Sequence, residues 1–338
     1  MKNENIRQQV TDKIVAAIAK GVIPWRRPWS QLVNTGVPVN FTTPHKHYHG
    51  INLMLLEMLM YQSRFWGTEA AWKKVHGFIH PTEYAVDVVY FNFIERKIGG
   101  KPVMIGGKAD KFPVMRLYQV YNAEQVQAPD VSLLVRKSRP ELVKMARGFK
   151  VVVFPEDTKT IIATKVHDAI NAKLERYKAQ SGEDRNVDPD FGPAEKLIAA
   201  TGANIRIGGD RASYNYDGDF IRVPSKRKFD SIADYYETEF HELIHWTEKK
   251  GRVGQRKDHT YAFGELVAEI GACYLCAELC VPHAAKMLTK SASYLSEWLK
   301  SFGSNPKYIF DAAAQASKAV DYLLKFADTG KKRRKKAA

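Results

Sequence analysis

The segment His241–His245, with the sequence HELIH, constrains this chain more than any other feature. Two histidines four positions apart project from the same face of an α-helix and can hold one zinc ion through their imidazole nitrogens. Glu242 follows the first histidine and is placed to act as the general base on an attacking water. The alternative is a helix whose histidines are ordinary surface or core side chains.

The residues before this segment favour a helix. Apolar Ile232, Tyr236 and Phe240 recur every four positions and form a stripe opposite the two histidines. Asp230 or Ser231 can cap the helix at its N-terminus. We therefore expect a helix that buries one face and keeps both imidazoles on the other.

A catalytic zinc needs a third protein ligand and one open position. Glu265 lies twenty residues after His245, in a predicted helix over Tyr261–Cys280, and Glu269 follows one turn later. Carboxylates in an apolar helix are costly unless a cation lies opposite. We expect Glu265 to be the ligand, with Glu269 as a hydrogen-bond acceptor for a ligand histidine or as the alternative ligand. The other possibility is that one glutamate pairs with a Lys or Arg.

These residues with one Zn²⁺ per chain predict metal-assisted hydrolysis of an amide bond. A predicted strand at Phe220–Val223, just before the helix, is a candidate to pair with an extended peptide. The hydrogen-bond donor for the oxyanion is expected among His259, Tyr261 and Tyr214, and the sequence does not choose between them.

Three cysteines fall in the same helix as Glu265. Cys273, Cys276 and Cys280 have a spacing compatible with metal binding, but offsets of three and four place them on one face of an apolar helix. We expect them to pack in the core, and their odd number implies no disulfide framework. This cysteine usage fits a reducing cytoplasm.

Positive charge is unevenly distributed along the 338 residues. Residues 1–150 contain 22 Lys and Arg against 11 Asp and Glu, residues 151–330 contain 24 against 26, and positions 331–336 add six cations. This asymmetry favours a polyanion-binding part joined to a part with another task, a solvated basic surface being the alternative. No apolar run is long enough to span a membrane, and the first residues lack a secretory signal, so neither membrane insertion nor secretion is expected.

The element pattern predicts an α+β chain. Helices are expected from Asn3 or Asn5 to Lys20, over 53–61, 68–75, 160–178, 261–280, 293–300 and 312–326, after Pro140, and at the HELIH segment; strands are expected over 85–93, 114–121, 151–154, 205–207, 212–216 and 220–223. We divide the chain into a domain at 1–128, a bridging region at 129–188, a mainly helical domain with a short sheet at 189–330, and a basic tail at 331–338.

Several motifs together resemble the ArdC antirestriction proteins of plasmids and other mobile elements. The C-terminal part is similar to the family's zincin-like, gluzincin-type metallopeptidase domain through the segments GGDRASY (208–214), DFIRVP (219–224), FHELIHWT (240–247) and YAFGELVAEIGACYL (261–275), and through Arg252. The N-terminal part is similar to its single-stranded-DNA-binding domain through IPWRRPW (23–29), YHGIN (48–52) and YQVYNAEQV (118–126). The chain departs from the family pattern at two places. Gly264 stands where the family usually has the first of two adjacent glutamates, and the segment HPTEY (80–84) stands where the family has a basic, glycine-containing turn.

The resemblance implies that the first domain binds single-stranded DNA. Single strands are held by aromatic rings under the bases and by cations along the phosphates. The residues that fit this chemistry are Trp25, Arg26, Arg27, Trp29, Lys46, Tyr48 and Asn52. The alternative is that the tryptophans anchor the loop in the core and only the arginines face solvent.

We thus expect a two-domain cytoplasmic protein that, as the resemblance implies, protects incoming mobile DNA from host restriction during conjugation or phage entry. Its expected partners are single-stranded DNA and host restriction proteins or another protein substrate, without a membrane. Two alternatives stay open: a non-enzymatic DNA-binding module with a latent protease-like scaffold, and an accessory protein of primase or relaxase function.

Overall fold

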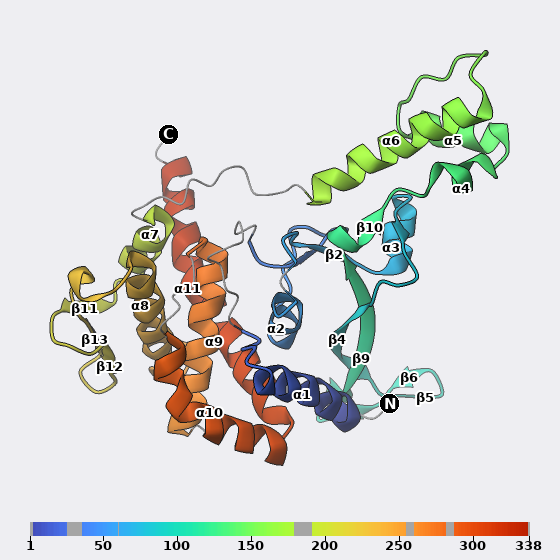
Figure 1. Cartoon of the computed structure of the whole chain (residues 1–338). Helices are drawn as coiled ribbons and strands as arrows, with labels where there is room; N and C mark the ends of the chain where they lie inside the picture. Colours follow the sequence, from blue (N-terminus) through green and yellow to red (C-terminus); the bar gives the residue numbers. More distant parts are fainter. Residues whose placement is uncertain are drawn as a thin grey trace.

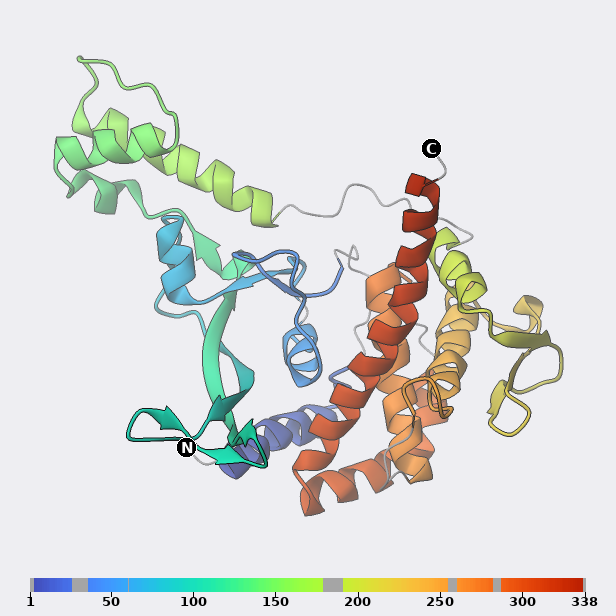
Figure 2. The same cartoon turned by 180° about the vertical axis from the view of Figure 1, so that it is seen from behind.

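The computed structural model describes residues 3–25, 36–59, 61–178, 191–254, 260–281 and 287–336. Figures 1 and 2 show an N-terminal half built around a long two-stranded ribbon and a C-terminal half built from packed helices with a small sheet at its outer side. Three helices that follow the ribbon project at one end of the molecule. The prediction of a mixed α+β chain with a mainly helical second half is confirmed.

The N-terminal half contains three helices and ten short or long strands among the described residues. They are α1 (Asn3–Ala19), β1 (Val39–Asn40), α2 (Ile51–Glu57), β2 (Phe65–Gly67), α3 (Glu69–Lys74), β3 (Phe78–Ile79), β4 (Val86–Glu95), β5 (Lys97–Ile98), β6 (Lys101–Pro102), β7 (Met104–Ile105), β8 (Lys108–Ala109), β9 (Lys111–Asn122), the 3₁₀ turn η2 (Ala123–Gln125) and β10 (Val126–Gln127). The main sheet has the order β1-β2-β9-β4, and β3 pairs with β10. The antiparallel ladder of β4 and β9 runs from Val86 opposite Val120 to Glu95 opposite Lys111.

Helix α1 forms where the sequence predicts it. The apolar stripe of Ile6, Val10, Ile14 and Ile18 is buried, and Gly21, with φ +79°, follows the end of the helix. A glycine at this position adopts the left-handed conformation without the steric cost of a side chain.

The bridging region folds into three helices, α4 (Val131–Val135), α5 (Arg139–Gly148) and α6 (Lys159–Lys178). The strand predicted at Val151–Phe154 is wrong, because none of the strands in the described ranges pairs with this segment. Its carbonyl groups are bound by side chains instead: Lys165 Nζ donates to Val152 O at 3.4 Å, and Arg139 donates to Phe154 O at 3.4 Å. An apolar β-branched run forms a strand only when a partner is available.

The C-terminal half begins with α7 (Gly192–Thr201), a helix that the sequence pattern does not predict. Its other elements are β11 (Asn204–Ile207), β12 (Ser213–Asn215), β13 (Phe220–Val223), the 3₁₀ turn η3 (Lys226–Lys228), α8 (Ile232–Thr247), α9 (Tyr261–Leu279), α10 (Met287–Ser304) and α11 (Lys307–Lys336). Helix α11 continues well beyond Phe326, where the sequence predicts its end. Among the described helices, none is long and apolar enough to cross a membrane.

Strand β13 lies in the middle of its sheet, in the order β11-β13-β12. It pairs in parallel with β11 and antiparallel with β12, so both of its edges are occupied. The expectation that β13 pairs with an extended peptide is therefore wrong. The outer edges of this sheet belong to β11 and β12.

The two halves share a hydrophobic core. One cluster of buried side chains contains Ile14 and Leu53 together with Leu243, Leu266 and other residues of α8, α9 and α11. A second cluster joins the main sheet to the helices of the bridging region.

Polar contacts at the YHGIN segment reinforce this union. The Gly50 N–H donates to Ser317 Oγ at 2.8 Å, and Tyr274 Oη donates to the Gly50 carbonyl at 2.9 Å. His47 Nδ1 lies 3.1 Å from Glu278 Oε1 on α9. The YHGIN motif thus joins the two halves of the chain through its contacts with α9 and α11.

Candidate metal centre

Helix α8 carries the two histidines in a rigid setting. Ser231 caps it by accepting a hydrogen bond from the Asp234 N–H at 3.1 Å. Tyr236, Phe240 and Leu243 are fully buried and fix the helix in the core. The side chains of His241 and His245 are each 15% exposed, on the face directed toward α9.

Helix α9 brings a carboxylate to both imidazoles. His241 Nε2 and His245 Nε2 lie 3.2 Å apart, and Glu265 approaches them with Oε2 at 3.5 Å from His241 Nε2 and Oε1 at 3.4 Å from His245 Nε2. One ligand atom from each residue lies within 4.8 Å of the other two. This His₂Glu group is the one metal-compatible cluster found among the described residues.

The spacing of these atoms fits a single metal ion. Ligand atoms about 2.0–2.1 Å from one tetrahedral zinc are separated from each other by about 3.3 Å. The two imidazole nitrogens, 3.2 Å apart, match that separation, and each lies 3.4–3.5 Å from one of the two Glu265 oxygens, with His245 facing Oε1 and His241 facing Oε2. The donor set of two imidazoles and one glutamate also leaves one tetrahedral position open, as catalytic zinc sites require.

The remaining nitrogen of each ring faces a carboxylate. His245 Nδ1 lies 2.9 Å from Glu248 Oε1, a residue that was not predicted from the sequence although it follows His245 by three positions on the same helix. His241 Nδ1 lies 3.9 Å from Glu269 Oε2, too far for a hydrogen bond, and this buried nitrogen has no hydrogen-bond partner in the described part of the chain. Carboxylates placed behind ligand imidazoles fix the ring orientation and raise the basicity of the ligand nitrogen.

The charged groups of the cluster shift each other's pKa values. Burial lowers the pKa of His245, but the hydrogen bonds to Glu248 and Glu265 outweigh burial and raise that pKa to about 10. Burial raises the pKa of Glu265, while its hydrogen bonds to His241 and His245 lower it well below the ordinary range. The negative carboxylates therefore stabilise a positive charge at the imidazoles, and either a proton or a metal ion can supply that charge.

Two further side chains lie at the cluster. Glu242 is buried, with 7% of its surface exposed. Tyr261 begins α9 and is exposed, and its ring centroid lies 5.9 Å from that of Tyr294. Hydrogen bonding with Tyr294, burial and the charge of Glu265 raise the pKa of Tyr261 well above its ordinary value, so the phenol stays protonated and able to donate.

Of the other predicted oxyanion donors, Tyr214 is engaged elsewhere: its hydroxyl donates to Asp219 Oδ1 at 2.9 Å. His259 lies outside the described residues. Among the three candidates, Tyr261 is the one whose pKa is affected by the charge of Glu265.

Arg252, one of the residues that resemble the ArdC family, binds Asp219. Arg252 donates to both oxygens of Asp219, at 2.9 and 2.7 Å, and to the Trp246 carbonyl at 2.7 Å, and its guanidinium lies 3.7 Å from the centre of the Trp246 ring. This clamp fixes the β12–β13 turn against the end of α8, where Trp246 directly follows the ligand His245. Cys273 and Cys276 are buried in the core as predicted, whereas Cys280 is only partly buried and follows the end of α9 in the left-handed conformation.

Of the residues predicted to bind DNA, the structure describes Trp25, Lys46, Tyr48 and Asn52. Trp25 is buried and packs edge-on against Trp298, with ring centroids 6.1 Å apart, which favours the core-anchor alternative. Asn52 binds the backbone of β4 through Val89, donating at 2.8 Å and accepting at 2.7 Å. Lys46 is exposed, and burial raises the pKa of the half-buried Tyr48 to about 12, against an opposing hydrogen bond to Asn40. Arg26, Arg27 and Trp29 lie outside the described residues.

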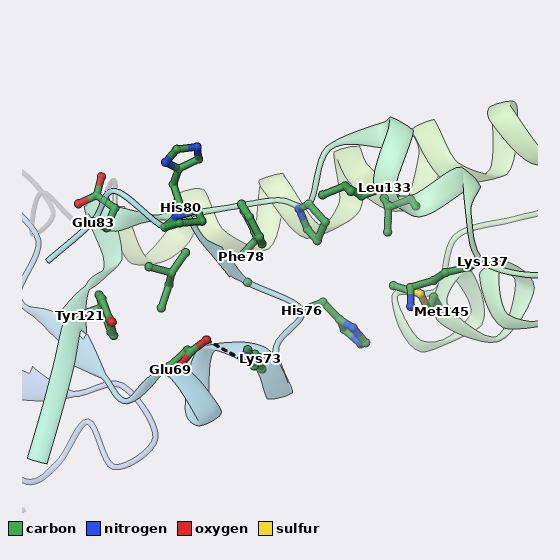
Figure 3. A pocket seen from close by; sticks show the side chains of 15 residues that line it. Glu69, Lys73, His76, Phe78, His80, Glu83, Tyr121, Leu133, Lys137 and Met145 are labelled. Atoms are coloured by element: carbon green, nitrogen blue, oxygen red, sulfur yellow. Dashed lines mark ion pairs between the residues drawn. The ribbon is translucent and has the colours of Figure 1, made fainter. Parts of the chain in front are cut away.

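A hollow of about 650 Å³ lies apart from these residues, between the α3–β3 segment and helices α4 and α5 (Figure 3). Its charged lining is largely paired: Lys73 contacts Glu69 at 2.5 Å, and Glu83 accepts from Gln125 at 3.0 Å. Burial, followed by the charges of Lys173 and Lys137, lowers the pKa of His76 at its rim. The metal-centre residues do not line this hollow.

Comparisons with known proteins agree with this geometry. Residues 4–121 match the family described as the N-terminal domain of anti-restriction factor ArdC, and residues 192–315 match the zincin-like metallopeptidase family. The metal-free crystal structure of the antirestriction protein ArdC from plasmid R388 is 30% identical, with a TM-score of 0.67 over 96% of this chain and 98% of that one. The chain belongs to the ArdC antirestriction family.

The Mn(II)-bound structure of the same ArdC is similar as well, with 30% identity and a TM-score of 0.64 over 95% of this chain and 97% of that one. Two Escherichia coli proteins named DNA primase TraC are 28% and 29% identical over 94% of this ArdC-family chain, which spans only 27% and 20% of their lengths. An uncharacterised protein of Sinorhizobium fredii, y4eC, is 25% identical over 94% of the chain and 91% of its own length.

Proposed function

We propose that this ArdC-family protein is a metal-dependent peptidase joined to a single-stranded-DNA-binding domain, and that it protects the incoming DNA of a plasmid or phage from host restriction in the cytoplasm. The observation that carries the peptidase proposal is the convergence of His241, His245 and Glu265 with the buried Glu242 beside them. We propose zinc as the ion, because the His₂Glu set is typical of catalytic zinc. The Mn(II) bound to the related ArdC makes manganese the competing candidate.

In this proposal His241, His245 and Glu265 hold the ion. The bound ion would supply Lewis acidity toward the substrate carbonyl and acidify the attacking water. Glu242 takes the proton from the attacking water and later delivers it to the leaving amine. Tyr261 donates a hydrogen bond to the developing oxyanion, and Glu248 holds the imidazole of His245 in orientation.

The substrate of such a site is an extended peptide, which can add to the free edge of a sheet. Strand β12 is an edge strand of the three-stranded sheet and packs against α8, whereas β13 is enclosed. We therefore assign peptide pairing to β12. Host restriction proteins are the substrates that an antirestriction role favours.

Metal content tests the proposal most directly. The purified protein, reconstituted with Zn²⁺ and separately with Mn²⁺ and then desalted, should retain about one ion per chain. A His241→Ala/His245→Ala variant should retain none, with its folding checked by circular dichroism. A wild-type protein that retains neither ion would refute the peptidase proposal and leave a DNA-binding module with a latent scaffold.

The TraC relatives favour a second function. They are named DNA primase, and this chain matches only a small part of their length. The chain would then be an accessory of DNA replication. Capture of replication proteins together with unchanged restriction of incoming DNA would support that function against antirestriction.

A further inference from the structure

The β4–β9 ribbon exposes several aromatic side chains. Successive residues of a strand point to opposite faces, so the register places one set on a common face, hereafter the open face of the ribbon. Its members are Val88, Tyr90, Asn92 and Ile94 from β4 and Phe112, Val114, Arg116 and Tyr118 from β9. Val88 is buried with Leu56 and Trp66, so this face is open from Tyr90 and Tyr118 outward. Tyr90, Ile94, Phe112 and Tyr118 are 45%, 40%, 39% and 43% exposed.

The opposite face is partly covered. Val89 and Met115 are buried there, in the core cluster that contains α1. Toward the end of the ribbon this face also exposes two rings, Phe91 and Phe93, which contact each other edge-on with centroids 5.2 Å apart. Figures 1 and 2 show the ribbon extending from the sheet toward the β5–β6 hairpin.

The rings of the open face are held by local contacts. Tyr90 and Tyr118 meet edge-on with centroids 5.7 Å apart, and Asn92 donates to Tyr90 Oη at 2.9 Å. The guanidinium of Arg96 lies 5.7 Å from the centre of the Phe112 ring. From Tyr118 to Phe112 the face is about 20 Å long, at roughly 3.3 Å per strand residue.

Cations lie on the open face and in the hairpins that follow it. Arg116 lies on the open face, directly opposite Tyr90 in the ladder, and Lys97, Lys101 and Lys108 belong to the hairpins at the end of the ribbon. In the part of the chain that the structure describes, none of these four cations forms a salt bridge with a carboxylate. The ribbon's carboxylates are taken up by other cations: Asp87 by Lys13, Glu95 by Lys111 and Asp110 by Arg96.

We infer that the open face of the β4–β9 ribbon is the surface that binds single-stranded DNA, with bases stacked on Tyr90, Phe112 and Tyr118 and phosphates held by Arg116 and the hairpin lysines. This inference rests on the DNA-binding part of the proposed function and moves its site away from Trp25, which is buried. Exposed rings beside cations are the chemistry that holds unpaired bases and their backbone. A protein partner fits less well, because protein interfaces are depleted in lysine.

The test measures the affinity of the full chain for a labelled oligodeoxythymidine by fluorescence anisotropy. Alanine at one of Tyr90, Phe112 and Tyr118 should weaken binding by about tenfold, and the triple variant by about a hundredfold or more, because each stacked base contributes on that scale. The matched control is Phe91→Ala/Phe93→Ala, two exposed rings on the opposite face of the same ribbon, which should bind within about twofold of wild type.

A second measurement addresses the cations. Replacing Arg116, Lys97, Lys101 and Lys108 by alanine should lower the slope of log Kd against log salt concentration by about 0.7 for each phosphate that is no longer neutralised. An oligonucleotide that contains bromodeoxyuridine should photo-cross-link to peptides within residues 86–122.

The outcomes separate this inference from the proposed function. If wild type binds the oligonucleotide and the three-ring variant binds equally well, or the cross-link maps to residues 23–36, the ribbon is not the site although DNA binding stands. If the control loses as much affinity as the three-ring variant, the assignment to the open face is wrong. If wild type does not bind single strands, both the inference and the DNA-binding proposal fail.

Discussion

Glu248 Oε1 lies 2.9 Å from His245 Nδ1, while Nε2 of the same ring faces His241 Nε2 at 3.2 Å. The carboxylate thus fixes which nitrogen of His245 is directed at the cluster. Because Glu248 is the C-cap residue of α8, three positions after His245, the arrangement is set by the helix end and does not depend on a distant loop.

This contact predicts a role for Glu248 in metal affinity. Glu248→Gln should weaken metal binding by about 10–100-fold, as is typical when the partner behind a ligand histidine is replaced. Competition with a chromophoric chelator measures the affinity. Lys250→Ala, two positions further along and exposed, is the control, and equal affinities for Glu248→Gln and wild type would contradict the prediction.

Glu242 is expected to act on protons and not on the metal. Glu242→Ala should retain about one ion per chain and lose peptidase activity by about 10²-fold or more, since general-base catalysis contributes on that scale. Cleavage of a peptide library and metal content are measured on the same preparation. Undiminished cleavage by the variant would remove Glu242 from the mechanism.

Tyr261 is expected to stabilise charge in the transition state. Tyr261→Phe removes only the hydroxyl and should lower kcat by about 10²-fold with KM and metal content little changed, as for other oxyanion donors. Tyr214→Phe is the matched control, because that hydroxyl is bonded to Asp219. An effect on KM alone would assign Tyr261 to substrate binding.

The ionisation of Asp219 is expected to make the stability of the folded protein depend on pH. The hydrogen bonds from Arg252, which outweigh burial, lower the pKa of Asp219 in the folded state. A depressed carboxyl pKa contributes stability that is present above the unfolded-state pKa of about 3.9 and is lost as pH falls through the folded value. The difference in Tm between wild type and Asp219→Asn should therefore be largest near neutral pH and shrink below about pH 4. A difference that stays constant with pH would contradict this.

Arg252→Lys tests the same clamp without changing its charge. Lysine cannot make the bidentate contact with Asp219 or stack on Trp246 as a planar group, so the variant should lose about 1–2 kcal/mol of stability. Urea unfolding at neutral pH measures this destabilisation, and Lys250→Arg, an exposed position two residues before Arg252, serves as the control. A variant as stable as wild type would show that the clamp does not contribute.

Elements with strong local patterns could be predicted from the sequence. Strand β13 has the predicted bounds, Ser231 caps α8, and α6 begins within one residue of its predicted start. The strand expected at Val151–Phe154 does not form, because strand formation needs a partner that no local pattern specifies. For the same reason the sequence could not reveal that β13 is enclosed by β11 and β12.

The spacing of His241, Glu242 and His245 determined by itself that two imidazoles and a carboxylate share one helix, because helical periodicity is a local property. Only the tertiary structure decided that Glu265 meets both imidazoles while Glu269 remains 3.9 Å from His241, because the packing of α9 on α8 sets those distances. Packing also buried Trp25 and left the rings of the β4–β9 ribbon exposed. An aromatic side chain has the same sequence signature in a core as on a binding surface, and its neighbours in three dimensions decide between them.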